Sequence, residues 1–345
     1  SRQFPQSFEA MNIQRLAATY RVWVESLKAH SPEGANAHVA LLTPGPYNET
    51  YFEHAYLARY LGLTLVEGHD LTVRDERVYL RTLRGLEPVH VLLKRMDDEF
   101  LDPLTFRADS VLGPPGLMAA ARLGNVTLAN AVGNGVADDK LVYTYMPDLT
   151  RYYLGEDPIV QNVQTWRLEE PESLAEVLDR LEELVVKPVD GSGGKGLVVG
   201  PAASKKELDD LRKKLKKDPR GWIAQPVIQF STIPTLVESG LRPRHADLRP
   251  FAVNSGDDIW VLPGGLTRVA LPEGELVVNS SQGGGSKDTW VIGGDRGATR
   301  TQLVTNSTVS GVVASQSSAD SGFARQQEQQ QQTAFLSDKK VPSDA

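Results

Sequence analysis

The strongest chemical signal in the sequence is a glycine-rich segment between two apolar runs, VVKPVDGSGGKGLVVG. Gly191, Gly193 and Gly196 follow the G-x-G-x-x-G spacing, Lys187 precedes them and Lys195 lies among them. Glycines allow backbone amides to approach an anion closely, and lysines neutralise its charge. The residue types therefore predict a phosphate-binding loop.

The residues around the loop decide which kind of phosphate-binding loop it is. Dinucleotide-binding and Walker A loops lead into a helix, whereas this loop leads into Leu197–Val199, which reads as a strand. A protein kinase has its glycine loop before its lysine strand and later HRD and DFG motifs, and this chain has neither that order nor those motifs. The remaining reading is a hairpin flap over a triphosphate, with Lys187 beside the α- and β-phosphates. The alternative is an ordinary glycine-rich hairpin with two surface lysines.

Alternating apolar segments predict a parallel, doubly wound α/β unit in residues 1–125. The pattern predicts helices over 11–27 and 52–61, and strands over 39–42, 63–66 and 89–93. In such a unit, ligands bind in the loops beyond the carboxyl ends of the strands. The breaker-rich segment TPGPYNET follows the first of these strands directly.

Residues 126–293 begin with helices and continue with short strands. Helices are predicted after Asp138 and over 172–183 and 203–217, and a pair of strands over 184–188 and 197–199. Further strands are predicted over 222–227, 248–253, 259–262, 267–271 and 276–278. After about Gly294 the composition changes to Ser, Gln, Thr and Ala, which predicts a disordered tail over 294–345.

The composition excludes several classes of function. Acidic residues outnumber basic ones by 44 to 37 in 345 residues, so a basic face for nucleic acid is not expected. The chain has no cysteine, which excludes disulfides, thiolate metal sites and a cysteine nucleophile. No apolar run approaches the roughly 18 residues of a membrane span, and the N-terminus has no secretory signal pattern. We expect a soluble cytoplasmic protein, and the initial Ser1 indicates a fragment of a longer one.

Seven unusual strings occur in an order that is specific to one family. They are LTPGPYNETYFEH, LKRMDDEFLDPLTFRADSVLGPPGL, NAVGNGVADDK, VVKPVDGSGGKGLVVGP, HADLRPFAV, PGGLTRVAL and VVNSSQGGGSKDTWV. Over roughly Phe8 to Ile292 the chain resembles the circularly permuted ATP-grasp proteins of type 2, which are distantly similar to glutathionylspermidine synthase. The resemblance implies an α/β ATP-grasp fold, in which a parallel pre-ATP-grasp unit precedes subdomains with a glycine-flap hairpin and antiparallel strands.

The resemblance also implies an activity. Such enzymes use ATP to phosphorylate a carboxylate, and an amine attacks the acyl phosphate to give an amide and ADP. The implied reaction is that of a carboxylate–amine ligase acting on small-molecule or peptide substrates. Two alternatives stay open: a nucleotide-binding module without catalysis, and an ATP-dependent phosphotransferase. Neither the substrates nor the oligomeric state follows from the sequence.

Motif by motif, the resemblance assigns the ATP site. Lys140 of ADDK matches the family's first ATP lysine, and Lys187 matches the second. Gln225 to Ile228 match the hinge strand whose backbone pairs with the adenine edge, and the Gln225 side chain is expected to reach the adenine amino group. The alternative for this strand is a buried core position. The flap comprises Gly191, Ser192, Gly193, Gly194 and Lys195.

Catalytic and substrate residues are assigned in the same way. Arg249 of DLRPF and Arg268 of GGLTR match cations that bind phosphate and acyl phosphate, a role suited to the planar arginine fork. The alternative is that both arginines pair with surface carboxylates. Asn279 matches the turn beside the acceptor substrate. Weaker substrate candidates are Asn48, Glu49 and Tyr51 after the first strand, and Gln282, Gly283 and Gly284 in the acceptor loop, which otherwise reads as a flexible loop.

Metal ligands are the least defined part of the site. Asp97, Asp98, Glu99 and Asp102 form an acidic run, but such runs are usually solvated loops and the spacing matches no oxygen cage. The six histidines show no ligand spacing. The family's Glu-x-Asn motif for Mg²⁺ does not occur in a strand between Ser1 and Ile292. Magnesium ligands are therefore expected upstream of this chain.

Overall fold

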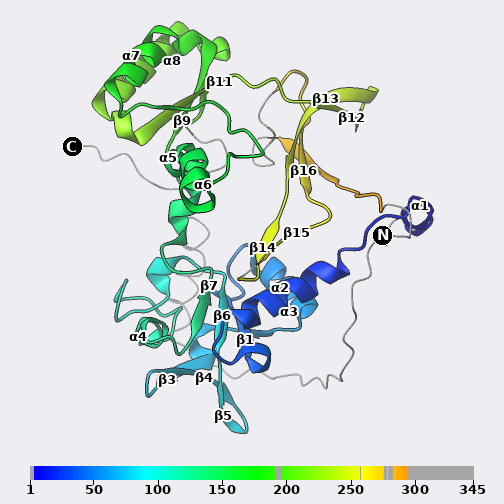
Figure 1. Ribbon diagram of the computed structural model, residues 1–345, viewed down its shortest axis with the longest axis vertical. Coiled ribbons are helices and arrows are strands. Elements are labelled where there is room, and N and C mark those ends of the chain that lie inside the picture. The colour runs from blue at the N-terminus through cyan, green and yellow to red at the C-terminus, as the bar shows by residue number, and fades with distance from the viewer. Residues whose placement is uncertain (1–3, 191–195, 257, 276–277, 279–282, 294–345) are drawn as a thin grey trace. The chain divides into compact units, whose positions relative to one another are not determined.

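The computed structural model describes residues 4–190, 196–256, 258–275, 278 and 283–293 (Figure 1). The chain divides into two compact units. Unit 1 comprises Ser1–Ala131, Pro250–Gly265 and Thr289–Ala345, and unit 2 comprises Val132–Arg249 and Leu266–Asp288. None of the helices in the described residues is long and apolar enough to cross a membrane.

Unit 1 is built on a parallel four-stranded sheet of order β2-β1-β6-β7. The strands are β1 (Val39–Leu42), β2 (Thr64–Val66), β6 (Val91–Lys94) and β7 (Thr127–Ala129). Because both faces of a parallel sheet are covered, its central strands read as continuous apolar runs, and all four residues of β1 are buried. Helices α2 (Ala17–Ala29) and α3 (Tyr51–Leu61) supply Leu27, Ala58 and Leu61 to the core around Leu41 and Leu93.

Smaller elements complete unit 1. A meander of β3 (Leu71–Arg74), β4 (Arg77–Thr82) and β5 (Gly85–Pro88) lies between β2 and β6 in the chain. Helix α1 (Pro5–Ala10) precedes α2, and α4 (Leu117–Arg122) precedes β7. The hairpin of β14 (Ala252–Asn254) and β15 (Ile259–Val261) joins unit 1, where the Ser26 hydroxyl of α2 donates to the Asn254 carbonyl at 2.5 Å.

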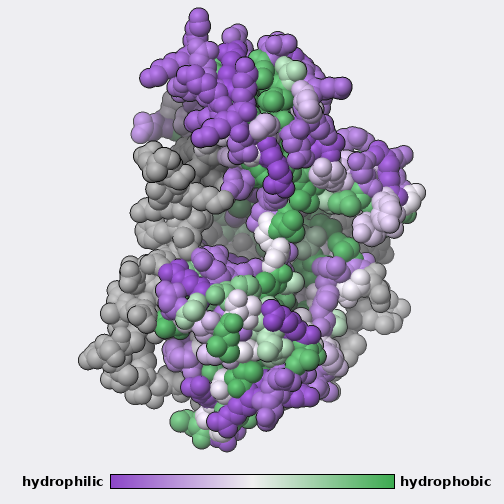
Figure 2. Space-filling view, turned by 90° about the vertical axis from the view of Figure 1, so that its left-hand side faces the viewer, coloured by the Kyte–Doolittle hydropathy of each residue, from purple (hydrophilic) through white to green (hydrophobic). Residues whose placement is uncertain are grey.

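The first sheet of unit 2 is antiparallel, with the order β10-β9-β11-β8. Its strands are β8 (Trp166–Arg167), β9 (Leu184–Pro188), β10 (Val198–Val199) and β11 (Trp222–Pro226). Helices α7 (Pro171–Asp179) and α8 (Lys205–Lys217) pack on one face, as Figure 1 shows at its top. The core there joins Val177, Leu208, Leu211 and Leu215 to Leu184, Val186, Ala224 and Trp166 of the strands. The outer side of these helices is rich in lysine and largely hydrophilic (Figure 2).

Strand alternation sends the other residues of β9 and β11 to the opposite face of this sheet. Ile223 of β11 packs there with Val189 and with Leu141 of α5 (Lys140–Thr144). Helix α6 (Met146–Leu154) follows α5 in the chain. This second face, in contrast to the helix-covered face, also carries polar side chains.

The second sheet of unit 2 is antiparallel and has the order β12-β13-β16-β17. Its strands are β12 (Thr232–Val237), β13 (Gly240–Arg249), β16 (Leu266–Ala270) and β17 (Gly284–Asp288). The mixed α/β fold class expected from the sequence is confirmed, with a parallel sheet in unit 1 and antiparallel sheets in unit 2.

The structure differs from the sequence-based expectation at several boundaries. A single strand over 248–253 is wrong, because β13 ends at Arg249 and β14 begins at Ala252 in a different sheet. Pro250 separates them, since proline has no N–H to continue a ladder. The helix expected from Met11 begins at Ala17. The units meet in the chain between residues 131 and 132, and the segment 250–265 belongs to unit 1.

Candidate functional site

Lys187 is the centre of the candidate site. Val186 points into the core beneath α7 and α8, so alternation along β9 places Lys187 on the opposite face of the sheet. Its ammonium donates to Oε1 of Gln225 at 2.7 Å. Burial lowers the pKa of Lys187, and the positive charge of Lys140 lowers it further. The two lysines predicted to bind ATP are therefore close enough to repel one another.

Lys140 is held at the start of α5. The Asp139 side chain caps this helix by accepting from the Leu141 amide at 2.7 Å. The Lys140 ammonium donates to the Val189 carbonyl at 3.3 Å. Burial lowers the pKa of Lys140, and the nearby Asp190, Asp139 and Asp138 oppose that shift. The packing of Leu141 against Val189 and Ile223 attaches the helix to the sheet.

Gln225 links Lys187 to a loop that the sequence did not single out. While its Oε1 accepts from Lys187, its Nε2 donates to the Thr165 hydroxyl at 2.8 Å. The Thr165 hydroxyl in turn donates to the Val163 carbonyl at 2.9 Å. Strand β11 ends at Pro226, so Ile228 lies just beyond it and is exposed. Sequence reasoning missed Thr165, because a lone threonine before a two-residue strand forms no recognisable pattern.

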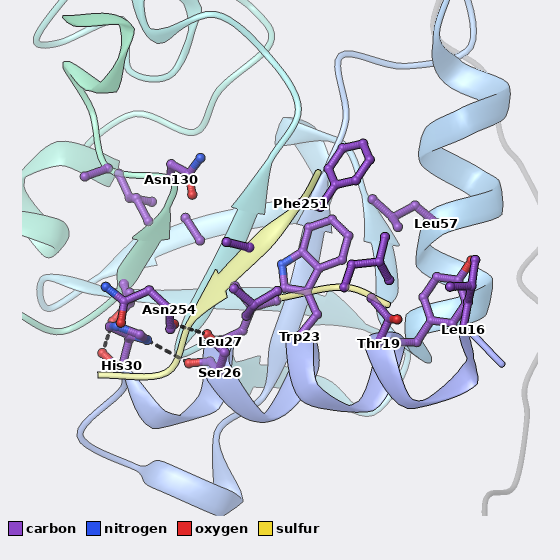
Figure 3. A pocket seen from close by; sticks show the side chains of 18 residues that line it. Leu16, Thr19, Trp23, Ser26, Leu27, His30, Leu57, Asn130, Phe251 and Asn254 are labelled. Atoms are coloured by element: carbon purple, nitrogen blue, oxygen red, sulfur yellow. Dashed lines mark hydrogen bonds between the residues drawn. The ribbon is translucent and has the colours of Figure 1, made fainter. Parts of the chain in front are cut away.

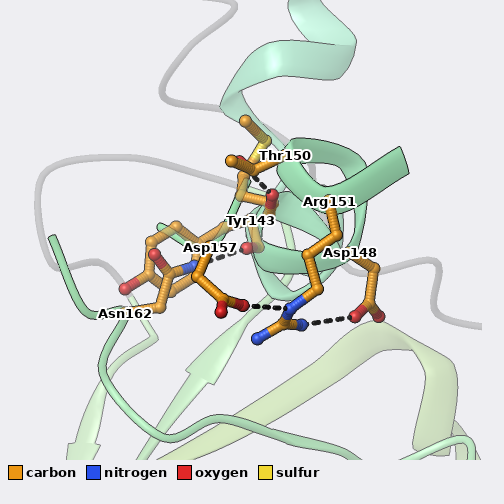
Figure 4. Close-up of polar contacts among 7 residues, drawn as sticks. Tyr143, Asp148, Thr150, Arg151, Asp157 and Asn162 are labelled. Atoms are coloured by element: carbon orange, nitrogen blue, oxygen red, sulfur yellow. Dashed lines mark hydrogen bonds and ion pairs between the residues drawn. The ribbon is translucent and has the colours of Figure 1, made fainter. Parts of the chain in front are cut away.

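The loop that carries Thr165 is fastened to α5 and α6 (Figure 4). The Asn162 amide nitrogen donates to the Tyr143 carbonyl at 3.0 Å, and the Val163 amide donates to the Tyr143 hydroxyl at 2.8 Å. Arg151 of α6 bonds to Asp157 at 2.8 Å and to Asp148 at 3.2 Å. The loop after α6 is thereby held against the helix pair that positions Lys140.

The strands on either side of the glycine loop pair as a hairpin. Val198 lies opposite Val186 and Val199 lies opposite Val185 in an antiparallel ladder. This pairing confirms that the loop connects two strands and not a strand and a helix. Gly196 has a φ of +71°, a conformation that glycine adopts without strain. The flap residues Gly191, Ser192, Gly193, Gly194 and Lys195 lie outside the described residues.

The two arginines lie on one face of the second sheet. Arg268 of β16 is directly opposite Asp247 of β13, and Arg249 lies two residues further along β13. Arg249 is partly exposed and pairs with Asp247 at 3.1 Å. This ion pair is the contact that the structural alternative for Arg249 expects. Lys187 and the arginines thus occupy different sheets of unit 2, and Lys140 lies on helix α5. Asn279 and Gln282 lie outside the described residues, while Gly283 has a φ of +84° and Gly284 begins β17.

The weaker candidates Asn48, Glu49 and Tyr51 follow β1 in unit 1. Asn48 is buried, whereas Glu49 is exposed. The Asn48 Oδ1 accepts from the amide and the hydroxyl of Thr50, the latter at 2.6 Å. Burial raises the pKa of Tyr51, and the charges of Glu67 and Asp70 raise it further.

His54 joins this loop to β1, a role that sequence reasoning missed. Its Nε2 lies 3.1 Å from the Thr50 hydroxyl and its Nδ1 lies 2.9 Å from the Thr43 hydroxyl. Because the Thr50 hydroxyl donates to Asn48, it accepts from Nε2–H, and Nδ1 accepts from Thr43. The network therefore assigns a neutral imidazole. Burial, and then the charge of Arg95, lower the pKa of His54 from 6.5 to about 4.

The acidic run has structural partners. Asp102 is fully buried and accepts hydrogen bonds from the backbone amides of Leu104, Gly116 and Met118 at 2.9 to 3.0 Å. Asp98 pairs with Lys94 at 2.7 Å. Within the described ranges, no group of three or more His, Asp or Glu residues is arranged to hold a metal ion.

Unit 1 also contains a pocket of about 800 Å³ between α2, β7 and β14 (Figure 3). Trp23 and Phe251 form part of its wall, and Ser26 and His30 lie at one end, where the His30 Nδ1 is 2.7 Å from the Ser26 carbonyl. None of the 18 described residues that line it is Asp, Glu, Lys or Arg. This pocket therefore lacks the cations that a triphosphate requires.

Comparison with known proteins assigns the family. An uncharacterized protein of Mycobacterium tuberculosis H37Rv is 61% identical over 258 residues, which are 75% of this chain and 47% of the relative. An uncharacterized protein of Synechocystis is 49% identical over 292 residues, 84% of this chain and 61% of that protein. A Frankia alni protein named "Putative glutamate--cysteine ligase 2-3" is 45% identical over 281 residues, 81% of this chain and 32% of that protein.

The chain spans about half the length of the mycobacterial relatives. Residues 1–270 match the family described as circularly permuted ATP-grasp type 2. The strand–loop–strand arrangement of the glycine segment, with Lys187 on the incoming strand, agrees with the motif on which the resemblance was based. This chain belongs to the circularly permuted ATP-grasp type 2 family.

Proposed function

We propose that the full-length protein is an ATP-dependent carboxylate–amine ligase and that unit 2 of this chain binds the ATP. The observation that carries the proposal is the pair of half-buried ammonium groups, Lys140 and Lys187, on one face of the sheet beside the glycine hairpin. The charge of Lys140 acts on Lys187, and two neighbouring cations are what a polyphosphate requires.

Electrostatics supports an anionic ligand at this pair. The causes that lower the pKa of Lys187 are burial and then Lys140, so the protein destabilises the cation instead of neutralising it. A bound triphosphate would restore the charged form, because an opposite charge within about 4–6 Å favours the ionised state. In this proposal Gln225, the hydrogen-bond partner of Lys187, accepts from the adenine amino group.

The reaction follows from the chemistry of the family. A carboxylate oxygen attacks the γ-phosphorus of ATP, ADP leaves, and an acyl phosphate forms. An amine then attacks the acyl carbon, phosphate leaves with the bonding pair, and the amine gives its proton to a base or to water. In this scheme Arg249, Arg268 and Asn279 stabilise the transferring group, and a fixed guanidinium suits the charge that redistributes during transfer.

The substrates are proposed by class only. The name of the Frankia relative is that of a ligase for two amino acids, which supports small amino-acid or peptide substrates. Asn48, Glu49 and Tyr51, with Gln282, Gly283 and Gly284, are proposed to recognise them.

Calorimetry of ATP binding to wild type and Lys187→Ala tests the site. Loss of a charge-assisted hydrogen bond costs roughly 1.5–3 kcal/mol, so the affinity should fall at least tenfold. Lys213→Ala is the matched control, since Lys213 is an exposed lysine of α8 that pairs with Asp210. Equal ATP affinity in Lys187→Ala and wild type would show that the site is wrongly assigned.

Trapping with hydroxylamine tests the reaction in the full-length protein. With ATP and a carboxylate but no amine, formation of the acyl phosphate releases ADP, and hydroxylamine then attacks the acyl carbon to give a hydroxamate and phosphate. A ligase gives hydroxamate in equal amount to ADP. ATP binding without ADP release would identify a non-catalytic module, and a stable phosphorylated product without hydroxamate would identify a phosphotransferase.

A further inference from the structure

We propose that Thr165 is a positioning residue that fixes the orientation of the Gln225 carboxamide, so that Gln225 presents oxygen to Lys187 and to the nucleotide base. This inference rests on the proposed ATP site. Its consequence is selectivity for adenine over guanine nucleotides. The residue lies 60 positions from Gln225 in the chain and belongs to no sequence motif.

The register of the sheet brings Thr165 to this position. In the antiparallel pair of β8 and β11, Ala224 faces Trp166 and Ile223 faces Arg167. Continuing the same register by one residue places Thr165 opposite Gln225. Trp166 and Ala224 point into the core beneath α7 and α8, so Thr165 and Gln225 lie on the other face. This is the face that carries Lys187.

Donor and acceptor chemistry at both ends allows one orientation of the amide. A lysine ammonium has three donors and no acceptor, so the group that Lys187 contacts at 2.7 Å is the Gln225 oxygen. The single hydroxyl proton of Thr165 is donated to the Val163 carbonyl at 2.9 Å. The hydroxyl oxygen can therefore only accept, and it accepts from Gln225 Nε2 at 2.8 Å. If the Gln225 amide were flipped, its NH₂ group would face the Lys187 ammonium, donor against donor. Its oxygen would face a lone pair of the Thr165 hydroxyl, acceptor against acceptor.

Thr165 is itself held by the network that positions the first lysine. The amide of Val163 donates to the Tyr143 hydroxyl. Asn162 donates to the Tyr143 carbonyl (Figure 4). Tyr143 lies on α5, whose first residue is Lys140. A continuous series of hydrogen bonds therefore runs from the helix of one lysine through Val163, Thr165 and Gln225 to the other lysine.

The orientation has a consequence for base recognition. An amide oxygen has two lone pairs, so Gln225 Oε1 can accept from Lys187 and from the exocyclic amino group of adenine. Guanine carries an oxygen acceptor at that ring position, which would meet the Gln225 oxygen with no proton between them. An unpaired buried polar group is costly, so the fixed amide rejects guanine. A freely rotating amide would accept either base.

The experiment compares Thr165→Val, Thr165→Ser and, as a matched control, Thr150→Val in the full-length protein. Valine keeps the branched shape and removes the hydroxyl, while serine keeps the hydroxyl. The hydroxyl of Thr150 donates within its own helix, to the Met146 carbonyl at 2.8 Å. Calorimetry gives the Kd for ATP and for GTP, and circular dichroism confirms that each variant is folded. Thr165→Ala repeats the test without the added methyl group.

We expect Thr165→Val to raise the Kd for ATP by about tenfold, as for loss of one partly buried hydrogen bond, and to lower the ratio of GTP to ATP Kd by a similar factor. Thr165→Ser and Thr150→Val should match wild type. In a Gln225→Glu background both terminal atoms of the side chain are oxygens, so there is no amide to orient. Thr165→Val should then cause no further loss of selectivity for ATP over GTP. Unchanged nucleotide affinities in folded Thr165→Val and Thr165→Ala would overturn the proposal.

A measurement without nucleotide separates this proposal from the proposed function. The pH profile of Lys187 acylation, read by mass spectrometry, reports its pKa in the free protein. Thr165→Val releases the amide, the ammonium loses a fixed acceptor, and the acylation profile should shift to lower pH, whereas Thr165→Ser should not shift it. An identical profile in Thr165→Val contradicts the positioning role. Failure of wild type to bind ATP, with the shift present, contradicts the ATP site and leaves the orientation of Gln225 supported.

Discussion

Acid should destabilise this protein through one buried histidine. His54 is 2% exposed and neutral, and its pKa lies near 4 instead of 6.5. Burial is the larger cause and the charge of Arg95 the smaller one. Both ring nitrogens are used by threonine hydroxyls, so protonation would also place a second N–H against the Thr43 hydroxyl.

The sign and size of the effect follow from linkage. Above pH 6.5 the imidazole is neutral in both the folded and the unfolded chain, so the contribution to stability is fully present. As the pH falls from 6.5 toward 4, His54 becomes protonated in the unfolded chain but stays neutral in the folded chain. The free energy of unfolding therefore decreases. A shift of about 2.5 units corresponds to roughly 3 kcal/mol in full, of which about 2 kcal/mol is lost between about pH 7 and about pH 5.

Urea denaturation of wild type and His54→Gln at these two pH values measures the effect. The variant lacks the titrating ring, so its free energy of unfolding should depend on pH less steeply, by about 2 kcal/mol over the interval. Other groups contribute equally to both proteins and cancel. His69→Gln, at an exposed histidine, controls for the loss of one imidazole. Equal slopes for wild type and His54→Gln would refute the reasoning, as would an NMR titration of His54 with a midpoint near 6.5.

The remaining predictions concern the nucleotide site and the core. Bound triphosphate raises the lowered pKa of Lys187, so ATP affinity should fall as pH rises through that pKa, with proton uptake visible by calorimetry in two buffers. Arg268→Lys in the full-length enzyme should lower kcat about tenfold with little change in the KM for ATP, because it keeps the charge and loses the planar fork. A change in KM alone, measured by ADP release, would make Arg268 an ion-pair residue. Asp102→Ala removes the acceptor of three backbone amides, one buried and two partly buried, and should lower the free energy of unfolding by about 3 kcal/mol in urea. Leu215→Ala, at a fully buried position, should cost about 2–5 kcal/mol, whereas Leu236→Ala, at an exposed one, should cost under about 0.5 kcal/mol.

The local pattern of apolar residues alone determined which face of the first antiparallel sheet carries Lys187. Strand β9 has the predicted bounds. Its burial alternates, with Leu184 and Val186 buried and Val185 and Lys187 less buried, as in a strand with one face on the core. Because Leu184 and Val186 face the core, strand alternation places Lys187 on the opposite face of the sheet. Strand β1 has the predicted bounds for a related reason, since a run of four apolar residues is buried on both sides of a parallel sheet.

Other strands depend on neighbours that the sequence does not reveal. Strand β13 reads GLRPRHADLR, with a proline and four charged residues, and no alternation marks it. It forms because β12 and β16 supply hydrogen-bonding partners on both edges. The pairing also sets Asp247 against Arg268 and beside Arg249, which decides the ion-pair partner of Arg249.

The hydrogen bonds of the candidate site were decided only by tertiary structure. Lys187 and Gln225 are 38 residues apart, and Gln225 and Thr165 are 60 apart. Periodicity assigns each side chain to a face, but it carries no information about which strand lies next to which, or in what register. A hydrogen bond exists only within a few tenths of an ångström of its ideal length, so it requires that register to be set. The sequence by itself therefore determined the lysines and the glycine loop, and the packing of three distant strands determined which atoms they meet.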